Sequence, residues 1–140
     1  MTVPSVADMM QAYAVEAIEF AHKRFDVALD YSPASLAKLD TMVDGLSPAA
    51  PCGMVKKLFR KMPSEDEIEQ MSRMLGGYLG EVCRRNLGGE WAVNEELEAI
   101  GILRQGDWIF PPAKVRKRLA TCTSDNLVSY YEALRLSSTT

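Results

Sequence analysis

The stretch Pro63–Trp91 limits the fold more than any other part of the chain, because it specifies one long helix with both ends marked. Ser64 and Glu67 have the spacing of a capping box, in which each side chain accepts a hydrogen bond from the other residue's backbone amide. Gly88 and Gly89 end the helix, since glycine adopts left-handed backbone angles at little cost. Between these signals apolar residues recur every three or four positions and predict one buried stripe: Ile68, Met71, Leu75, Tyr78, Leu79 and Val82.

A second face of this helix lacks large side chains. At about 100° per residue, Gly76 and Gly80 lie beside the apolar stripe, on the same face as Ser72 and Cys83. Glycine in a helix interior costs roughly 1 kcal/mol relative to alanine, so this groove needs a compensating contact. We expect either the close approach of another helix or strand, or a ligand or partner backbone lying in the groove.

Glu81 lies at the boundary between the apolar stripe and the polar face, followed by Arg84 and Arg85 at helical spacing. One interpretation is an ordinary Glu–Arg helix pair, worth a few tenths of a kcal/mol. The other is a half-buried carboxylate, held by Arg85 at the mouth of the glycine groove. In that case the protein would be an enzyme or small-molecule binder with its pocket at Gly76–Gly80 and Glu81.

Composition narrows the class of protein. With 140 residues, 47% of them hydrophobic, the chain is long enough to bury roughly two thirds of its unfolded surface in one core. A net charge of −3 gives no general attraction to nucleic acid or membranes. The three widely spaced cysteines, Cys52, Cys83 and Cys122, favour neither a disulfide framework nor a zinc site. No signal peptide or membrane-spanning stretch is evident, so we expect a cytoplasmic protein.

The remaining elements predict a mostly helical α+β fold with a small antiparallel sheet of two or three strands after the long helix. Trp91 and Trp108 are expected on neighbouring strands, with at least one against the long helix. Residues 1–136 would form one globular domain and residues 137–140 a frayed tail. The other predicted segments are a helix at 6–24 capped by Ser5, an extended segment at 25–31, a helix at about 33–44 ended by Gly45, a loop at 47–53, a short basic helix at 54–62, strands within 90–110 closed by Pro111 and Pro112, a helix at 113–122 and a last helix with Leu127, Val128, Tyr131 and Leu134 facing inward.

Three segments carry a resemblance to a known family: LDYSPASLAKLD at 29–40, GGYLGEVCRRNLGGEW at 76–91 and PPAKVRKRLATCTSDNLVSYYEAL at 111–134. Together they resemble a small bacterial domain of unknown function that has a Tyr-Leu-Gly-Glu-Val run, a Gly-Gly-x-Trp and a Pro-x-x-Lys-Val-x-Lys-Arg-Leu segment. The resemblance implies a bacterial or phage-borne origin and supplies no activity, cofactor or catalytic residue. Pro112 stands where the family pattern has an aromatic residue, and Cys122 with Thr123 replaces its Asn-Gly turn.

The sequence contains none of the constellations that common catalytic chemistries require. It has no phosphate-binding glycine loop, no HExxH and no GxSxG, and His22 is its single histidine. We therefore predict no catalytic residue, metal or cofactor.

The best candidate surface for an interaction is the basic run after Trp108, which comprises Lys114, Arg116, Lys117 and Arg118. Basic residues beside an aromatic residue can hold an acidic protein partner, or a phosphate backbone with a stacked base. We expect a small binding module, such as an immunity or regulatory protein, that holds an acidic protein partner. Weak nucleic-acid binding through Lys114–Arg118 is a further alternative, and the oligomeric state stays open.

Overall fold

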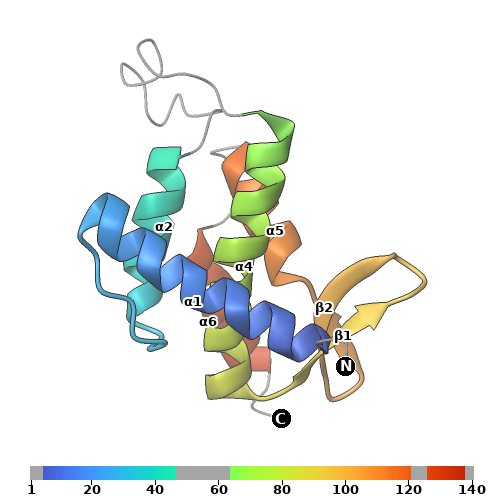
Figure 1. Cartoon of the computed structure of the whole chain (residues 1–140). Coiled ribbons are helices and arrows are strands. Elements are labelled where there is room, and N and C mark those ends of the chain that lie inside the picture. Colours follow the sequence, from blue (N-terminus) through green and yellow to red (C-terminus); the bar gives the residue numbers. More distant parts are fainter. Residues whose placement is uncertain (1–4, 47–63, 121–125, 138–140) are drawn as a thin grey trace.

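The computed structural model describes residues 5–46, 64–120 and 126–137, and within these ranges the chain forms five helices and three strands. In Figure 1, α4 runs through the middle of the molecule, α1 crosses it, and the sheet lies to one side. The predicted mostly helical α+β fold, with an antiparallel sheet after the long helix, is confirmed. The elements are α1 (Val6–Phe25), α2 (Ser35–Leu46), α4 (Glu65–Leu87), β1 (Glu90–Asn94), β2 (Ala99–Arg104), β3 (Asp107–Ile109), α5 (Pro111–Ala120) and α6 (Leu127–Ser137).

The central helix α4 begins and ends where the sequence predicts. The amide of Glu67 donates to Ser64 Oγ over 3.1 Å, and the amide of Ser64 donates to Glu67 Oε1 over 3.4 Å, which completes the capping box. Gly88 ends the helix with φ of 91°, and its amide donates to the carbonyl of Arg84. The predicted stripe forms the centre of the core, since four of its members have no exposed surface: Leu75, Tyr78, Leu79 and Val82.

Small residues allow α1 to cross close to α4. Ser5 caps α1 as predicted by accepting a hydrogen bond from the amide of Asp8. Ala14, Ala17 and Ala21 of α1 are fully buried. On α4, a Cβ atom at Gly77 would lie 2.9 Å from Tyr13 Cβ and 3.0 Å from the carbonyl oxygen of Met10. The two helices therefore approach each other closely enough for their backbones to be in contact. This close approach explains why Gly77 is the third glycine inside the long helix.

The sheet has the strand order β1-β2-β3, with both pairs antiparallel. Gln105 and Gly106, which the sequence places between two of the short strand runs, form the turn that joins β2 to β3, and both residues have positive φ angles, 48° and 86°. The two tryptophans are not on neighbouring strands as predicted, because β2 separates them. Trp91 on β1 packs against Gly80 of α4, whereas Trp108 on β3 stacks on Phe110 with ring centroids 5.9 Å apart.

The segment after α1 pairs with no strand of the sheet, and Asp26 and Tyr31 at its two ends have left-handed φ angles of 54° and 65°. Two helix boundaries were predicted wrongly. Helix α2 starts at Ser35 and continues through Gly45 to Leu46. Pro111 and Pro112 begin α5 rather than only closing β3, since proline is well suited to the first turn, where no amide hydrogen is needed.

Several predictions fall outside the described residues: the loop at 47–53, the basic helix at 54–62, Cys52, Cys122 and the end of the tail at 138–140. Asn126, which is described, caps α6 by accepting a hydrogen bond from the amide of Ser129 over 2.8 Å. None of the helices in the described ranges is long and apolar enough to cross a membrane.

Candidate functional site

The glycine groove of α4 is filled by the protein itself. A Cβ atom at Gly76 would lie 2.8 Å from the backbone nitrogen of Pro112 and closer still to its Cα atom. At Gly80 a Cβ atom would overlap the ring of Trp91. The first turn of α5 and one tryptophan therefore occupy the groove. Close packing was the correct interpretation of the glycines, and the alternative of an open pocket at Gly76–Gly80 was wrong.

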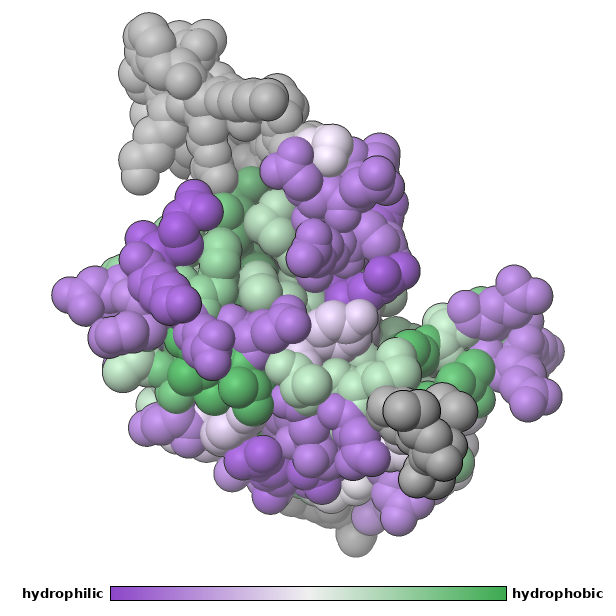
Figure 2. All heavy atoms as spheres, viewed as in Figure 1, coloured by the Kyte–Doolittle hydropathy of each residue, from purple (hydrophilic) through white to green (hydrophobic). Residues whose placement is uncertain are grey.

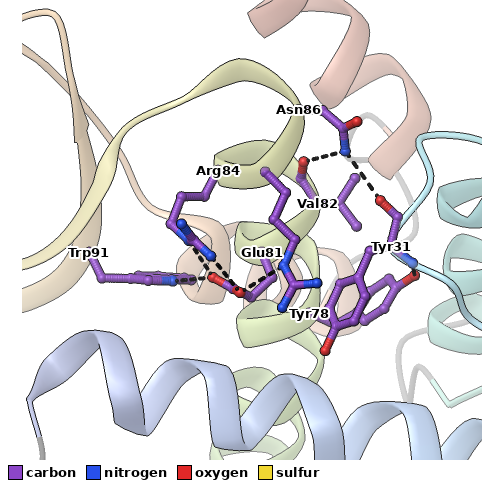
Figure 3. A network of polar contacts seen from close by, with 8 residues as sticks. Tyr31, Tyr78, Glu81, Val82, Arg84, Asn86 and Trp91 are labelled. Atoms are coloured by element: carbon purple, nitrogen blue, oxygen red, sulfur yellow. Dashed lines mark hydrogen bonds and ion pairs between the residues drawn. The ribbon is translucent and has the colours of Figure 1, made fainter.

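Glu81 is the centre of a polar network that Figure 3 shows from close by. Its carboxylate has no exposed surface and accepts four hydrogen bonds. Arg84 donates two of them over 2.7 and 3.0 Å, Arg85 donates one over 3.1 Å, and Trp91 Nε1 donates one over 2.8 Å. The pair with Arg85 forms as proposed from the sequence. Because protein donors surround both carboxylate oxygens, the arrangement links β1 to α4 and offers Glu81 no position beside a substrate.

The network continues through two tyrosines to α2. The guanidinium of Arg85 lies 3.6 Å from the centre of the Tyr31 ring, which stacks on Tyr78 at 5.3 Å. The Tyr78 hydroxyl accepts a hydrogen bond from the amide of Tyr31 over 2.8 Å and lies 2.6 Å from Ser35 Oγ. Sequence reasoning missed these contacts, because Tyr31 precedes Tyr78 by 47 residues and no local pattern joins them.

Glu81 stays ionised in spite of its burial. Burial acts to raise the pKa of Glu81, but the hydrogen bonds from Arg84 and Trp91, together with the charge of Arg84, bring it below its ordinary value. The carboxylate is thus an anion that three side chains hold, and its proton affinity is too low for general acid chemistry near neutral pH.

The stability that Glu81 provides is expected to fall in acid. A carboxylate with a lowered folded pKa stabilises the protein above its unfolded pKa of about 4.3, and this contribution is lost as the pH falls through the folded value. The free energy of unfolding by urea should therefore differ between wild type and Glu81→Gln by a constant amount from about pH 6 to pH 8, and the difference should shrink below about pH 4. A difference that does not change with pH would contradict an ionised Glu81.

Cys83 carries no nucleophilic chemistry. The thiol is buried on α4, and burial raises the pKa of Cys83 to about 12. It is therefore protonated at neutral pH, and a buried, protonated thiol is chemically inert. Within the described residues no group of three or more His, Cys, Asp or Glu side chains could hold a metal ion.

The basic residues of α5 do not form one surface. Arg116 pairs with Glu65 and Glu69 of α4, whereas Arg118 pairs with Asp40 over 3.2 Å and with Asp44 of α2 over 3.6 Å. Lys114 Nζ lies 5.7 Å from the ring of Tyr130, and Lys117 is exposed. The proposed patch is therefore divided between two sides of the helix, and its arginines already have carboxylate partners.

The two arginines of α5 are expected to differ in their effect on stability. Replacing Arg118, 7% exposed, by methionine leaves Asp40 without its counter-charge and should lower the free energy of unfolding by about 2 kcal/mol. The matched change Arg116→Met removes a half-exposed pair and should cost less than about 1 kcal/mol. Urea unfolding measures both, and equal losses would argue against a structural role that is special to Arg118.

A cleft of about 470 Å³ lies between the first half of α1, the first half of α4, the start of β2 and the start of α5. We call it the α1–α5 cleft. On the face drawn in Figure 2, hydrophobic residues lie between the hydrophilic upper part of α4 and the sheet. Sequence reasoning missed the cleft, because its walls come from four segments. Its apolar lining includes Met9, Met10, Tyr13, Ile100, Phe110 and Pro112, and its charged residues are Glu69, Arg73, Glu98 and Arg116.

Comparison of the chain with protein-family models, with curated proteins and with solved structures gave no match.

Proposed function

We propose that this protein is a small binding module, such as an immunity or regulatory protein, that holds a segment of an acidic protein partner in the α1–α5 cleft. The observation that carries the proposal is the lining of this cleft, in which methionines and aromatic residues lie beside two arginines. Flexible methionine side chains adapt to the shape of a partner, and aromatic residues supply much of the binding energy at interfaces.

Two glutamates and two arginines line the cleft, and among them Arg73 favours a partner that brings its own carboxylate. Arg73 pairs only with Glu69 over 3.3 Å among the described residues, and both side chains are about half exposed. Such a surface pair contributes little stability, so Arg73 can exchange Glu69 for a partner carboxylate at small cost. Glu69 would keep Arg116 as its counter-ion. The expected partner segment therefore has apolar side chains for the cleft and an acidic residue for Arg73.

The same lining argues for binding rather than catalysis. The carboxylate of Glu69 is held by Arg73 and Arg116, and the Ser72 hydroxyl donates to the carbonyl of Ile68 over 2.7 Å. No histidine or cysteine lines the cleft, so it has no nucleophile beside a base. The described residues of the cleft thus offer contacts to a ligand and no catalytic arrangement.

Site-specific photocrosslinking tests the proposal. A photoreactive amino acid replaces Met9, 38% exposed at the cleft, or Val15, 50% exposed on the same helix and outside the cleft. In host cells the Met9 position should give a discrete protein adduct, and the added change Arg73→Glu should reduce its yield about tenfold, which corresponds to loss of one interfacial charge pair. The Val15 position should give no such adduct. The proposal fails if both positions give the same adducts or if neither reacts.

A further inference from the structure

Arg104, at the end of β2, is a buried charge without a counter-ion among the described residues. It is 8% exposed, and no carboxylate of the described residues lies within ion-pair distance of it. Its Nε atom is buried and has no hydrogen-bond partner. The two other fully or nearly buried charged residues are paired: Glu81 with its arginines, and Arg118 with Asp40 and Asp44. Arg104 is the exception.

An unpaired buried guanidinium is costly, because arginine cannot lose its proton inside a protein. Only part of this cost is offset by the surroundings. A Cβ atom at Gly89 would lie 2.5 Å from Arg104 Cγ, so the arginine stem passes directly beneath the turn that follows α4. The C-terminal end of α4, which carries a partial negative charge, therefore lies near Arg104. No described carbonyl group there accepts a hydrogen bond from the Nε atom of Arg104.

The cross-strand neighbour of Arg104 does not neutralise it either. Arg104 pairs with Asp107 in the antiparallel register, so both side chains leave the same face of the hairpin. The side chain of Asp107 is exposed and makes no ion pair with Arg104. The positive charge keeps unused hydrogen-bonding capacity, because a guanidinium has five N–H donors and the buried Nε–H of Arg104 has no partner among the described residues.

We propose that Arg104 anchors a binding site for a small oxyanion, a phosphate or carboxylate group, at the junction of the α4–β1 turn and the β2–β3 hairpin. The planar guanidinium suits two oxygens of one such group. Arg104 is not part of the α1–α5 cleft, so the site is independent of the proposed partner.

Arginine side-chain NMR tests the site directly. The protein, labelled with ¹⁵N, is titrated with inorganic phosphate and separately with acetate, with chloride adjusted to constant ionic strength. The Arg104 Nε–H signal should shift and saturate, while the signal of Arg24, which is exposed on α1, should not saturate. Saturation by phosphate alone assigns a phosphate ligand, and saturation by acetate as well assigns a general oxyanion site. No saturable shift with either anion up to about 50 mM would overturn the proposal.

Two variants separate an external anion from a role for Asp107. Arg104→Gln should abolish the rise in melting temperature that phosphate gives relative to chloride, and Arg24→Gln should retain it. Asp107→Asn should tighten phosphate binding by a few fold, because it removes a nearby competing carboxylate. If Asp107→Asn instead lowers the melting temperature and leaves phosphate without effect, Asp107 is the counter-ion and the proposal is wrong.

Discussion

Replacing Glu81 by alanine is expected to lower the free energy of unfolding by about 3–5 kcal/mol, which would leave the domain marginally stable. The carboxylate is fully buried and accepts hydrogen bonds from Arg84, Arg85 and Trp91. Its removal leaves the Trp91 N–H without an acceptor and two guanidinium groups without their shared counter-charge. Urea unfolding of the purified variant measures the loss.

Glu132 supplies a matched control for Glu81. It pairs with Arg135 at the same spacing of three residues and the same distance of 2.7 Å as Glu81 with Arg84, but its side chain is 47% exposed. Glu132→Ala should therefore cost less than about 1 kcal/mol. If the two alanine variants lose similar stability, burial does not give the Glu81 network its importance.

Replacing Gly76 by alanine is expected to lower the free energy of unfolding by about 3 kcal/mol, although alanine is the better helix former. The added methyl group would meet the backbone of Pro112, which cannot turn aside as a flexible side chain can. Relief requires α5 to move away from α4, and that movement would separate Arg116 from Glu65 and Glu69. Thermal and urea unfolding both measure the effect.

Gly45 is the matched control for Gly76, because it also lies in a helix but, apart from its own helix backbone and chain neighbours, no atom of the described residues lies within 4 Å of the position that a Cβ would take. Gly45→Ala should raise the free energy of unfolding by roughly 0.5–1 kcal/mol through helix propensity and loss of unfolded-state freedom. A stabilising Gly76→Ala would show that α5 does not hold its observed position against α4.

The parts of the fold that could be predicted are those whose signals lie close together in the sequence. The capping box at Ser64, the stop at Gly88 and the turn at Gln105–Gly106 each act within a few residues, and all three are present. The wrong predictions arose where one pattern permits two structures. Pro111 is compatible with the end of a strand and with the start of a helix, and only the contact of Pro112 with Gly76 shows which one forms.

The contacts of the candidate site residues could be predicted only in part. Glu81 and Arg85 lie one helical turn apart, so their pair was foreseen. The partners of Arg118 could not be foreseen, because Asp40 precedes it by 78 residues and any carboxylate in the chain was an equal candidate. The α1–α5 cleft likewise depends on how four separate segments meet. Charge and spacing identified the basic residues of α5, but not which of them are already neutralised.

The ring of Trp91 performs two tasks at once, and this restricts how the chain can vary. The ring fills the space above Gly80, and its N–H donates to the buried Glu81. A smaller residue at position 91 would make room for a larger one at position 80, but it would strip the carboxylate of a donor. A larger residue at position 80 does not fit while Trp91 is present, because its Cβ atom would overlap the indole ring. A single substitution at Gly80, Glu81 or Trp91 is therefore expected to lower stability. A change at one of these positions requires a compensating substitution at another at the same time.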